Sequence, residues 1–299
     1  MTHFQIFGST SPSGYAFHKL VSSTFPSSSS TTYSRHNSTC YPDSKFLDLS
    51  NPDTSILPRK LSVLISFAPI WAFSNFLSYV DEHISGYFKH IQAIVVCSST
   101  SAITKRFSFS HYDRHLSAML VHHEDLVVSL CSKHNIKHAI VRPSMIYGLV
   151  GPYSDANISQ LTKIMSFSPF LFLPSQTGLR QPIHATQLAS VFLSLSDNLT
   201  SSDHFFNNSS CHIYNVGGDS ELTYHEMLKA IQQALPINHS ARNCLFIRIP
   251  NRLFYFFASP LLFASSKLFE SFLRISSNLS GFTPAHKFLG VSPRPFPII

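Results

Sequence analysis

The stretch that decides the fold lies near the N-terminus and runs Phe7-Gly8-Ser9-Thr10-Ser11-Pro12-Ser13-Gly14-Tyr15. Residues 4–7 before it form an apolar run typical of a buried strand, and residues 13–24 after it are typical of a helix. Gly8 permits a tight turn, and Gly14 permits the helix to pack closely on the strand. A helix beginning here presents free N–H groups and a partial positive charge, which suit a pyrophosphate. The stretch therefore predicts a dinucleotide-binding βα unit.

Two positions refine the expected cofactor. Ser11 stands where the usual G-x-x-G-x-x-G spacing has its middle glycine, and its side chain narrows the approach of the backbone to phosphate. The next expected strand, 31–34, ends at Ser34 and Arg35, where NAD-selective sites carry an acidic residue and where an arginine suits a 2′-phosphate. We therefore expect NADP, with NAD as the alternative. The expected cofactor contacts are Gly8, Thr10, Ser11, Ser13, Gly14, Ser34, Arg35, Asp48, Phe67, Ala68 and Pro69.

Strand and helix patterns alternate along the first half of the chain. The expected strands are 4–7, 31–34, 45–49, 61–68, 91–97, 137–141 and 213–216, and the expected helices are 13–24, 70–90, 112–134, 157–167 and 221–235. Such alternation implies right-handed crossovers and a parallel sheet covered on both faces. We expect an α/β fold, a Rossmann-type doubly wound parallel sheet. Residues 1–148 would form the NAD(P)-binding domain, and residues 149–299 a smaller substrate-binding lobe with part of the sheet and apolar C-terminal helices.

Composition excludes several other classes of protein. The chain has 299 residues and a net charge of +7, but its basic residues are scattered, so no nucleic-acid partner is indicated. Only 12% of residues are charged, against about 25% in an average domain. Five cysteines without a C-x-x-C pair, and histidines without ligand spacing, indicate neither a disulfide framework nor a metal site. With no signal-peptide pattern, we expect a reducing, cytoplasmic location.

Residues 252–273 are strongly apolar but are interrupted by Pro260. Their uncharged stretch is shorter than the roughly 20 residues that span a bilayer. We expect a packed or membrane-surface helix pair, with a peripheral membrane contact as the alternative to burial.

Several further motifs, taken with the glycine turn, resemble those of one family. They are VCSSTS at 96–101, VRPSMIYG at 141–148, GLRQPIH at 178–184, YNVGG at 214–218 and LGVSPRPF at 289–296. By their order and spacing the chain resembles, over almost its whole length, the extended or atypical short-chain dehydrogenase/reductases, often described as nucleoside-diphosphate-sugar epimerases or NAD-dependent epimerase/dehydratases.

The resemblance implies catalytic positions. A Ser or Thr after the fifth strand would hydrogen-bond the substrate, and Thr100 is the match, with Ser99 adjacent. The family's Tyr-x-x-x-Lys pair performs proton transfer. If Glu124 matches the glutamate that follows the pair, these positions hold Leu116 and Leu120, which can transfer no proton. The candidates to replace the pair are Lys105, Tyr112 and Tyr147, of which we expect Tyr112 to be a packed residue.

The resemblance also implies a substrate. Asn157 and Arg180 match residues that contact a nucleotide-sugar diphosphate, although an arginine here equally suits a helix end. The implied activity is an epimerase- or reductase-like oxidoreductase acting on a nucleotide-activated or lipid-linked sugar, such as serves polysaccharide biosynthesis, with a homodimer as a further partner. The alternative, favoured by the missing Tyr/Lys pair, is a catalytically silent NADP-binding sensor or assembly protein.

Overall fold

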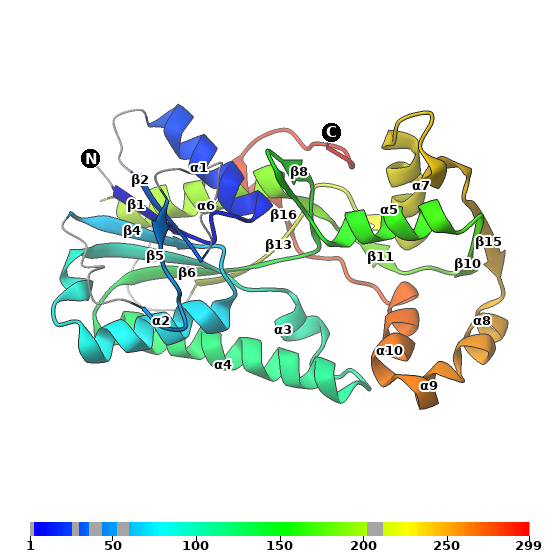
Figure 1. Ribbon diagram of the computed structural model, residues 1–299, viewed down its shortest axis with the longest axis horizontal. Coiled ribbons are helices and arrows are strands. Elements are labelled where there is room, and N and C mark those ends of the chain that lie inside the picture. The colour runs from blue at the N-terminus through cyan, green and yellow to red at the C-terminus, as the bar shows by residue number, and fades with distance from the viewer. Residues whose placement is uncertain (1–2, 26–29, 36–43, 53–59, 202–211, 299) are drawn as a thin grey trace.

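A computed structural model describes residues 3–25, 30–35, 44–52, 60–201 and 212–298. The described chain forms two lobes that lie side by side (Figure 1). One lobe surrounds a large sheet, and the other is smaller and is built from the C-terminal half of the chain.

The large sheet has eight strands in the order β16-β13-β6-β5-β4-β1-β2-β3, and every pair of neighbours is parallel. Its strands are β1 (His3–Phe7), β2 (Ser30–Ser34), β3 (Lys45–Phe46), β4 (Ser62–Ser66), β5 (Ile91–Cys97), β6 (Lys137–Pro143), β13 (His212–Gly217) and β16 (Thr283–Pro284). β1 lies between β2 and β4, so the strand order reverses at β1. In sheets of this kind, ligands bind in the crevice beyond the carboxyl ends of the strands at that point.

Helices cover both faces of the sheet (Figure 1). The helices α1 (Pro12–Thr24) and α6 (Ala185–Thr200) pack together on one face, and α2 (Ile70–His83) and α4 (His111–Lys133) pack together on the other. The strands are buried on both sides: Leu64 of β4 joins the core under α2 and α4, whereas its neighbour Ile65 joins the core under α1 and α6. The expected doubly wound α/β fold is confirmed.

Some element boundaries differ from the sequence-based expectations. The helix expected over 70–90 ends at His83, because Gly86 has a φ of 81°, which an α-helix cannot accommodate. The chain then forms a short 3₁₀ helix, η1 (Tyr87–His90). The strand expected over 45–49 is only two residues long.

The smaller lobe has its own apolar core, which includes the buried side chains Met165, Leu173, Met227, Leu228 and Ile231. Its elements are α5 (Asn157–Phe167), β10 (Phe170–Pro174), β11 (Leu179–Arg180), β14 (Leu222–Thr223), α7 (Tyr224–Ala234), η2 (Ser240–Asn243), β15 (Leu245–Ile249), α8 (Asn251–Ala258), α9 (Leu261–Ala264) and α10 (Ser266–Ile275). By contrast α6, β13, β16 and α11 (Ala285–Leu289) belong to the sheet lobe, so the C-terminal half contributes to both lobes.

Short elements connect the lobes. They are α3 (Ser101–Thr104), β7 (Ile146–Tyr147), β8 (Leu149–Val150), β9 (Tyr153–Ser154) and β12 (Ile183–His184). The apolar stretch 252–273 forms α8, α9 and most of α10. Within the described residues, no helix combines the length and hydropathy needed to cross a membrane.

A buried ion pair fastens α4 to the sheet. Glu124 of α4 is 1% exposed, and both its oxygens accept hydrogen bonds from the Arg142 guanidinium of β6, one of them from Nε at 2.9 Å. Ser98, just after β5, also donates its hydroxyl to Glu124. The two-pronged geometry suits an arginine–carboxylate pair, and removing one member would leave a charge buried without its partner.

We expect Arg142→Ala to lower the free energy of unfolding by about 3–5 kcal/mol, because the Glu124 carboxylate would lose its buried partner. The measurement is urea denaturation followed by circular dichroism. The control is Lys133→Ala, which removes an ion pair to Asp81 whose lysine side chain is 62% exposed and should cost less than about 1 kcal/mol. Equal losses in the two variants would contradict a special role for the buried pair.

Candidate functional site

The glycine turn between β1 and α1 leaves no room for side chains. Gly8 has a φ of 75°, and a Cβ on it would stand 2.5 Å from the backbone nitrogen of Ala68. A Cβ on Gly14 would stand 2.3 Å from the carbonyl oxygen of Gly8. Thr10 is half-buried and Ser13 is buried in the same turn. The backbones of β1, α1 and the end of β4 therefore meet at van der Waals contact, as a dinucleotide turn requires.

Ser11 caps α1 with its hydroxyl, which donates to the Gly8 carbonyl at 2.8 Å and accepts the Gly14 N–H at 3.1 Å. Pro12 at the first helical position has no N–H to offer. Two of the donors with which a helix N-terminus holds phosphate are thus already satisfied or absent. The turn keeps its shape but presents fewer N–H groups to a pyrophosphate than a glycine at position 11 would allow.

The expected adenosine-side residues lie at the ends of β2 and β3. Ser34 is buried, whereas Arg35 is exposed. Asp48 is half-buried and accepts the N–H of Ser50 at 2.9 Å. Arg35 is the charged residue at the end of β2, which is where a 2′-phosphate would be read. Residues 36–43, which follow it, lie outside the described part of the chain.

The segment after β4 contributes its backbone rather than its largest side chain. The ring of Phe67 packs against Phe192 at 4.4 Å and Phe17 at 5.8 Å between centroids, within the core under α1 and α6. Ala68 lies against the glycine turn, and Pro69 is exposed at the start of α2. The backbones of Phe67 and Ala68 thus both lie against Gly8.

The polar side chains just after β5 form hydrogen bonds to backbone groups of the protein. Thr100 is 8% exposed, and its hydroxyl donates to the carbonyl of Pro143 at 3.1 Å. Ser99 is half-buried and accepts the N–H of Ser101. A hydroxyl that donates to a carbonyl can still accept a hydrogen bond from a substrate, so Thr100 retains one of the two functions the resemblance implies.

The two positions on α4 where the resemblance implies proton-transfer residues hold leucines, and both leucines lie in apolar surroundings. Leu120 is 4% exposed and belongs to the core under α2 and α4, together with Ala102 of α3. Leu116 packs against the same core.

Lys105 is held by a carboxylate that also joins the two lobes. Its Nζ lies 2.7 Å from Oδ1 of Asp113 on α4, and Asp113 is 4% exposed. The other oxygen of Asp113 lies 2.8 Å from the guanidinium of Arg274 on α10. Two cations thus share one buried carboxylate, and Arg274 also lies 3.7 Å from the carboxylate of Glu270 on its own helix. The sequence analysis missed Asp113 and Arg274, because 161 residues separate them along the chain.

Tyr112, the neighbour of Asp113, is 56% exposed and has the ammonium of Lys267 4.5 Å from its ring centroid. This cation–π contact is a second link between α4 and α10. Tyr112 is therefore a surface residue at the lobe boundary, whereas the sequence analysis expected a packed tyrosine.

Tyr147 is buried, 4% exposed, between the rings of His184 and Phe296. Its hydroxyl accepts the N–H of Ile298 at 2.9 Å, and burial raises its pKa to about 12. The raised pKa works against Tyr147 as a proton acceptor near neutral pH.

Arg180 and Asn157 are both hydrogen-bonded within the protein. Arg180 is 6% exposed and donates to the carbonyls of Leu179, Arg274 and Ser277, the last two at the end of α10. Burial lowers its pKa to about 10. Asn157 is exposed and donates its amide to the Ile146 carbonyl at 3.0 Å. Hydrogen bonds to these carbonyls satisfy the buried guanidinium of Arg180 without a ligand. This is the structural role at a helix end that the sequence analysis gave as the alternative to phosphate binding.

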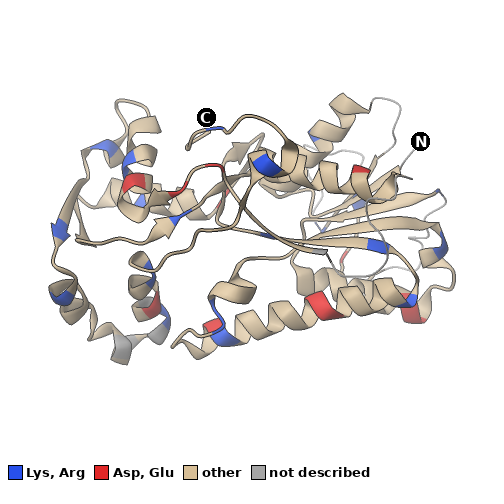
Figure 2. Ribbon diagram, turned by 180° about the vertical axis from the view of Figure 1, so that it is seen from behind, with Lys and Arg blue, Asp and Glu red and all other residues tan. Residues whose placement is uncertain are grey.

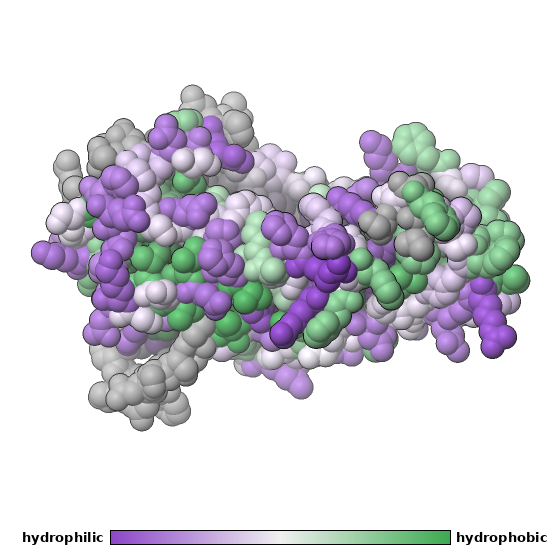
Figure 3. Space-filling model, turned by 90° about the horizontal axis from the view of Figure 1, so that it is seen from below, coloured by the Kyte–Doolittle hydropathy of each residue, from purple (hydrophilic) through white to green (hydrophobic). Residues whose placement is uncertain are grey.

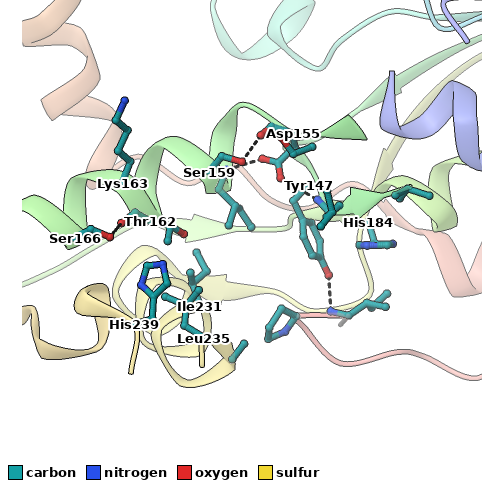
Figure 4. Close-up of a pocket in the computed structure, with 18 of the residues that line it drawn as sticks. Tyr147, Asp155, Ser159, Thr162, Lys163, Ser166, His184, Ile231, Leu235 and His239 are labelled. Carbon is teal, nitrogen blue, oxygen red and sulfur yellow. Dashed lines mark hydrogen bonds between the residues drawn. The ribbon is translucent and has the colours of Figure 1, made fainter. Parts of the chain in front are cut away.

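A cavity of about 1040 Å³ lies beside α5, between that helix, the end of α7 and the C-terminal residues (Figure 4). Of the predicted site residues only Tyr147 lines it. The α5 side carries the polar residues Asp155, Ser159, Thr162, Lys163 and Ser166 beside the apolar Ile158 and Phe167, and Ile231 of α7 with Leu235 just beyond it makes the facing wall apolar. The hydroxyl of Ser166 donates to the Thr162 carbonyl within α5, and that of Ser159 donates to the Asp155 carbonyl just before the helix. The helical spacing of this polar face was readable from the sequence, but the opposing wall was not.

The similarity of this chain to known proteins lies in its fold. No protein-family model matches the sequence, and no curated protein is significantly similar to it. Among solved structures, UDP-glucuronic acid 4-epimerase from Bacillus cereus, in complex with NAD, superposes with a TM-score of 0.65 at 12% identity, over 98% of this chain and 94% of that one. The dTDP-glucose 4,6-dehydratase from Bacillus anthracis, also with NAD, gives 0.54 at 14% identity over 83% and 85%.

MoeE5 in complex with UDP-glucose and NAD is similar as well, with a TM-score of 0.60 at 12% identity over 98% of this chain and 94% of that chain. The chain shares the fold of these solved structures. The resemblance inferred from the sequence motifs is thereby confirmed at the level of the fold. Identities this low establish no activity, so the site must carry the functional argument.

We expect Ser11→Gly to tighten NADPH binding by about three- to tenfold, because it frees the Gly14 N–H for the pyrophosphate. Glycine replaces serine as a helix N-cap at a cost of only a few tenths of a kcal/mol, so α1 should remain intact. Nicotinamide fluorescence titration measures the affinity. Unchanged affinity would mean that the cap does not limit the turn.

The opposing variant is Gly14→Val, whose side chain would begin 2.3 Å from the Gly8 carbonyl oxygen. We expect it to abolish dinucleotide binding, with far-UV circular dichroism as the check that the protein still folds. Normal binding by a folded Gly14→Val protein would place the dinucleotide elsewhere.

Proposed function

We propose that this chain binds a nicotinamide dinucleotide in the crevice at the carboxyl ends of β1, β2 and β4. The observation that carries the proposal is the pair of glycines whose missing Cβ atoms let β1, α1 and the end of β4 meet. That geometry sits in the first βα crossover of a parallel sheet, where the strand order reverses. The residues present therefore fit a dinucleotide.

Arg35 supports NADP as the preferred form. It is the exposed cation at the end of β2, and neither it nor buried Ser34 could accept the hydrogen bonds of a ribose 2′-hydroxyl as a carboxylate does. The neighbouring solved structures contain NAD, so this preference distinguishes the chain from them.

For the substrate we propose a nucleotide-activated sugar, with a lipid-linked sugar as the alternative. The support is that fold neighbours covering nearly the whole chain are epimerases or dehydratases or bind such sugars. Asn157, exposed at the start of α5, is the predicted contact that remains reachable from solvent. Arg180 would have to release the carbonyls at the end of α10 before it could bind phosphate.

The chemistry proposed is that of an epimerase/dehydratase-like oxidoreductase, in which the bound nicotinamide would exchange a hydride with a sugar carbon. Such a reaction also needs a group that takes or returns the hydroxyl proton. Thr100 can position that hydroxyl. Lys105, held by Asp113 near the end of α3, is the ionisable candidate nearest to Thr100 in sequence.

The second candidate function is a catalytically silent NADP-binding sensor or assembly protein. One observation favours it specifically: Leu120 is 4% exposed within an apolar core, and Leu116 packs against the same core. The two residues that perform proton transfer in relatives are thus replaced by packing, not by other polar groups.

Titration with NADPH, followed by addition of UDP- and GDP-sugars, separates these functions. Binding together with sugar-dependent oxidation or reduction of the nicotinamide supports the enzyme, and Lys105→Ala should then abolish turnover while leaving NADPH binding intact. Binding with no response to any sugar supports the silent protein. Failure to bind either dinucleotide would refute both.

We expect Arg35→Ala to weaken NADPH binding by about tenfold or more and to leave NADH binding nearly unchanged, since only NADPH carries the 2′-phosphate. Parallel fluorescence titrations of the two cofactors measure this. An equal loss for both would show that Arg35 does not read the 2′-phosphate.

A further inference from the structure

The cavity beside α5 lies apart from the residues proposed to bind the dinucleotide and the sugar. The described residues that line it include none of the expected cofactor contacts, and they include neither Thr100, Asn157 nor Arg180. Its volume of about 1040 Å³ is close to the upper limit of small-molecule sites, about 300–1,000 Å³. The cavity is therefore large enough to hold a ligand of its own.

One wall of the cavity is apolar and firmly held. Ile231 and Ala234 lie in the last turn of α7, and Leu235 follows directly. Ile231 is 3% exposed and belongs to the core of the smaller lobe, so packing fixes the position of this wall. Pro297 and Ile298 of the C-terminal segment also line the cavity. Such a wall favours the hydrocarbon part of a ligand, because contact removes apolar surface from water.

The α5 side of the cavity carries one cation. Among the described residues that line the cavity, Lys163 is the one Lys or Arg and Asp155 the one Asp or Glu. Both oxygens of Asp155 accept backbone N–H groups, from Gly148 at 3.0 Å and from Ile158 at 2.6 Å. Lys163 is exposed and is the one charged residue of α5, in a chain whose charged residues are sparse (Figure 2). Lys163 is therefore the charge that a ligand in this cavity would meet.

The donors lie around the apolar wall. Figure 4 shows the side chain of Lys163 extending from α5 on the side away from Ile231 and Leu235, so its ammonium lies at the rim of the cavity. His239 also lines the cavity, and its Nδ1 accepts the N–H of Ala241 at 3.2 Å. The neutral His239 ring therefore carries its proton on Nε2, which offers a second donor. Both groups suit a ligand that accepts hydrogen bonds.

We propose that this cavity binds an amphiphile with a single negative charge, a carboxylate on a hydrocarbon chain. The carboxylate would pair with Lys163 at the rim, and the chain would lie along Ile231, Ala234 and Leu235. The inference goes beyond the proposed dinucleotide and sugar sites and does not depend on either.

Other classes of small molecule fit this cavity less well. The phosphates of a nucleotide would bring several negative charges to a cavity that offers one lysine and already contains the carboxylate of Asp155. A neutral sugar would match the hydroxyl groups of α5 but would leave the apolar wall of Ile231 and Leu235 in contact with water. One charge on an apolar chain matches both sides of the cavity.

The test is isothermal titration calorimetry of the full chain with dodecanoate below its micelle concentration. We expect saturable binding, and much weaker binding of dodecyltrimethylammonium, which has the same chain with a positive head group. Lys163→Gln should weaken dodecanoate binding by about threefold or more, because an exposed ion pair is lost. Ala234→Trp should weaken it by about tenfold or more, because the indole would occupy the space beside the apolar wall.

Each variant has a matched control outside the cavity. Lys229→Gln removes an exposed lysine of α7, and Ala118→Trp adds the same indole to an exposed position of α4. Hydrophobic residues also gather at the outer end of the smaller lobe (Figure 3), where Phe256 of α8 is 70% exposed, and Phe256→Ser tests uptake there. We expect all three controls to bind dodecanoate as the unaltered protein does. Circular dichroism of each variant checks that it remains folded.

Four results would overturn the proposal. The first is the absence of saturable dodecanoate binding. The second is equal loss of affinity in Ala234→Trp and Ala118→Trp. The third is equal affinity for dodecanoate and dodecyltrimethylammonium, which would show that Lys163 does not select the charge. The fourth is a loss in Phe256→Ser with Ala234→Trp unaffected, which would place the amphiphile on the outer surface of the lobe.

Discussion

The position that a Cβ of Gly14 would occupy lies 2.3 Å from the carbonyl oxygen of Gly8, and the corresponding position on Gly8 lies 2.5 Å from the backbone of Ala68. This contact among three backbones brings α1 directly over the end of β1 and beside β4. A side chain at either glycine would push α1 away, and with it the helix N-terminus that faces the crevice. The expected cofactor site depends on this close approach, as does the packing of α1 with α6 on the same face of the sheet. Ser11 stabilises the same turn but uses a phosphate-binding N–H in doing so.

An ion pair between Arg274 and Asp113 links the smaller lobe to the sheet lobe. Two residues for which the sequence analysis expected a role in catalysis or substrate binding lie in the same hydrogen-bonded region. Arg180 is committed to the carbonyls that end α10, and Arg274 of the same helix reaches Asp113 on α4. Lys105, the candidate for a new catalytic role, shares that carboxylate. These hydrogen bonds and ion pairs stabilise the structure, because a buried guanidinium or carboxylate without a partner has a large desolvation cost. Any substrate that enters between the lobes must therefore compete with protein–protein hydrogen bonds.

The region around α4 has a buried ion pair to the sheet but has leucines at the two positions where proton-transfer residues were expected. Glu124 and Arg142 still fasten the helix to β6, while positions 116 and 120 have joined the apolar core. The first contact is needed to hold α4 in place whatever the protein does. The leucines add packing at the two positions where the resemblance implies a tyrosine and a lysine. The proposed cofactor binding does not depend on these positions, whereas the proposed turnover would need a proton-transfer group from elsewhere.

The sequence by itself determined the layered α/β fold, because strand and helix periodicities and the glycine turn are local patterns with local physical causes. It also located α5 at 157–167, and it located α7, whose observed range of 224–234 falls within the expected 221–235. It could not determine which polar residues were free to bind ligands. The partners of Asp113 and Arg180 come from α10, more than ninety residues away along the chain. Nor could it tell which phenylalanines of 252–273 would be buried, because that depends on which face of α8 meets the lobe core. Such choices belong to the tertiary structure, since burial and hydrogen-bond partnership arise only when distant segments are brought together.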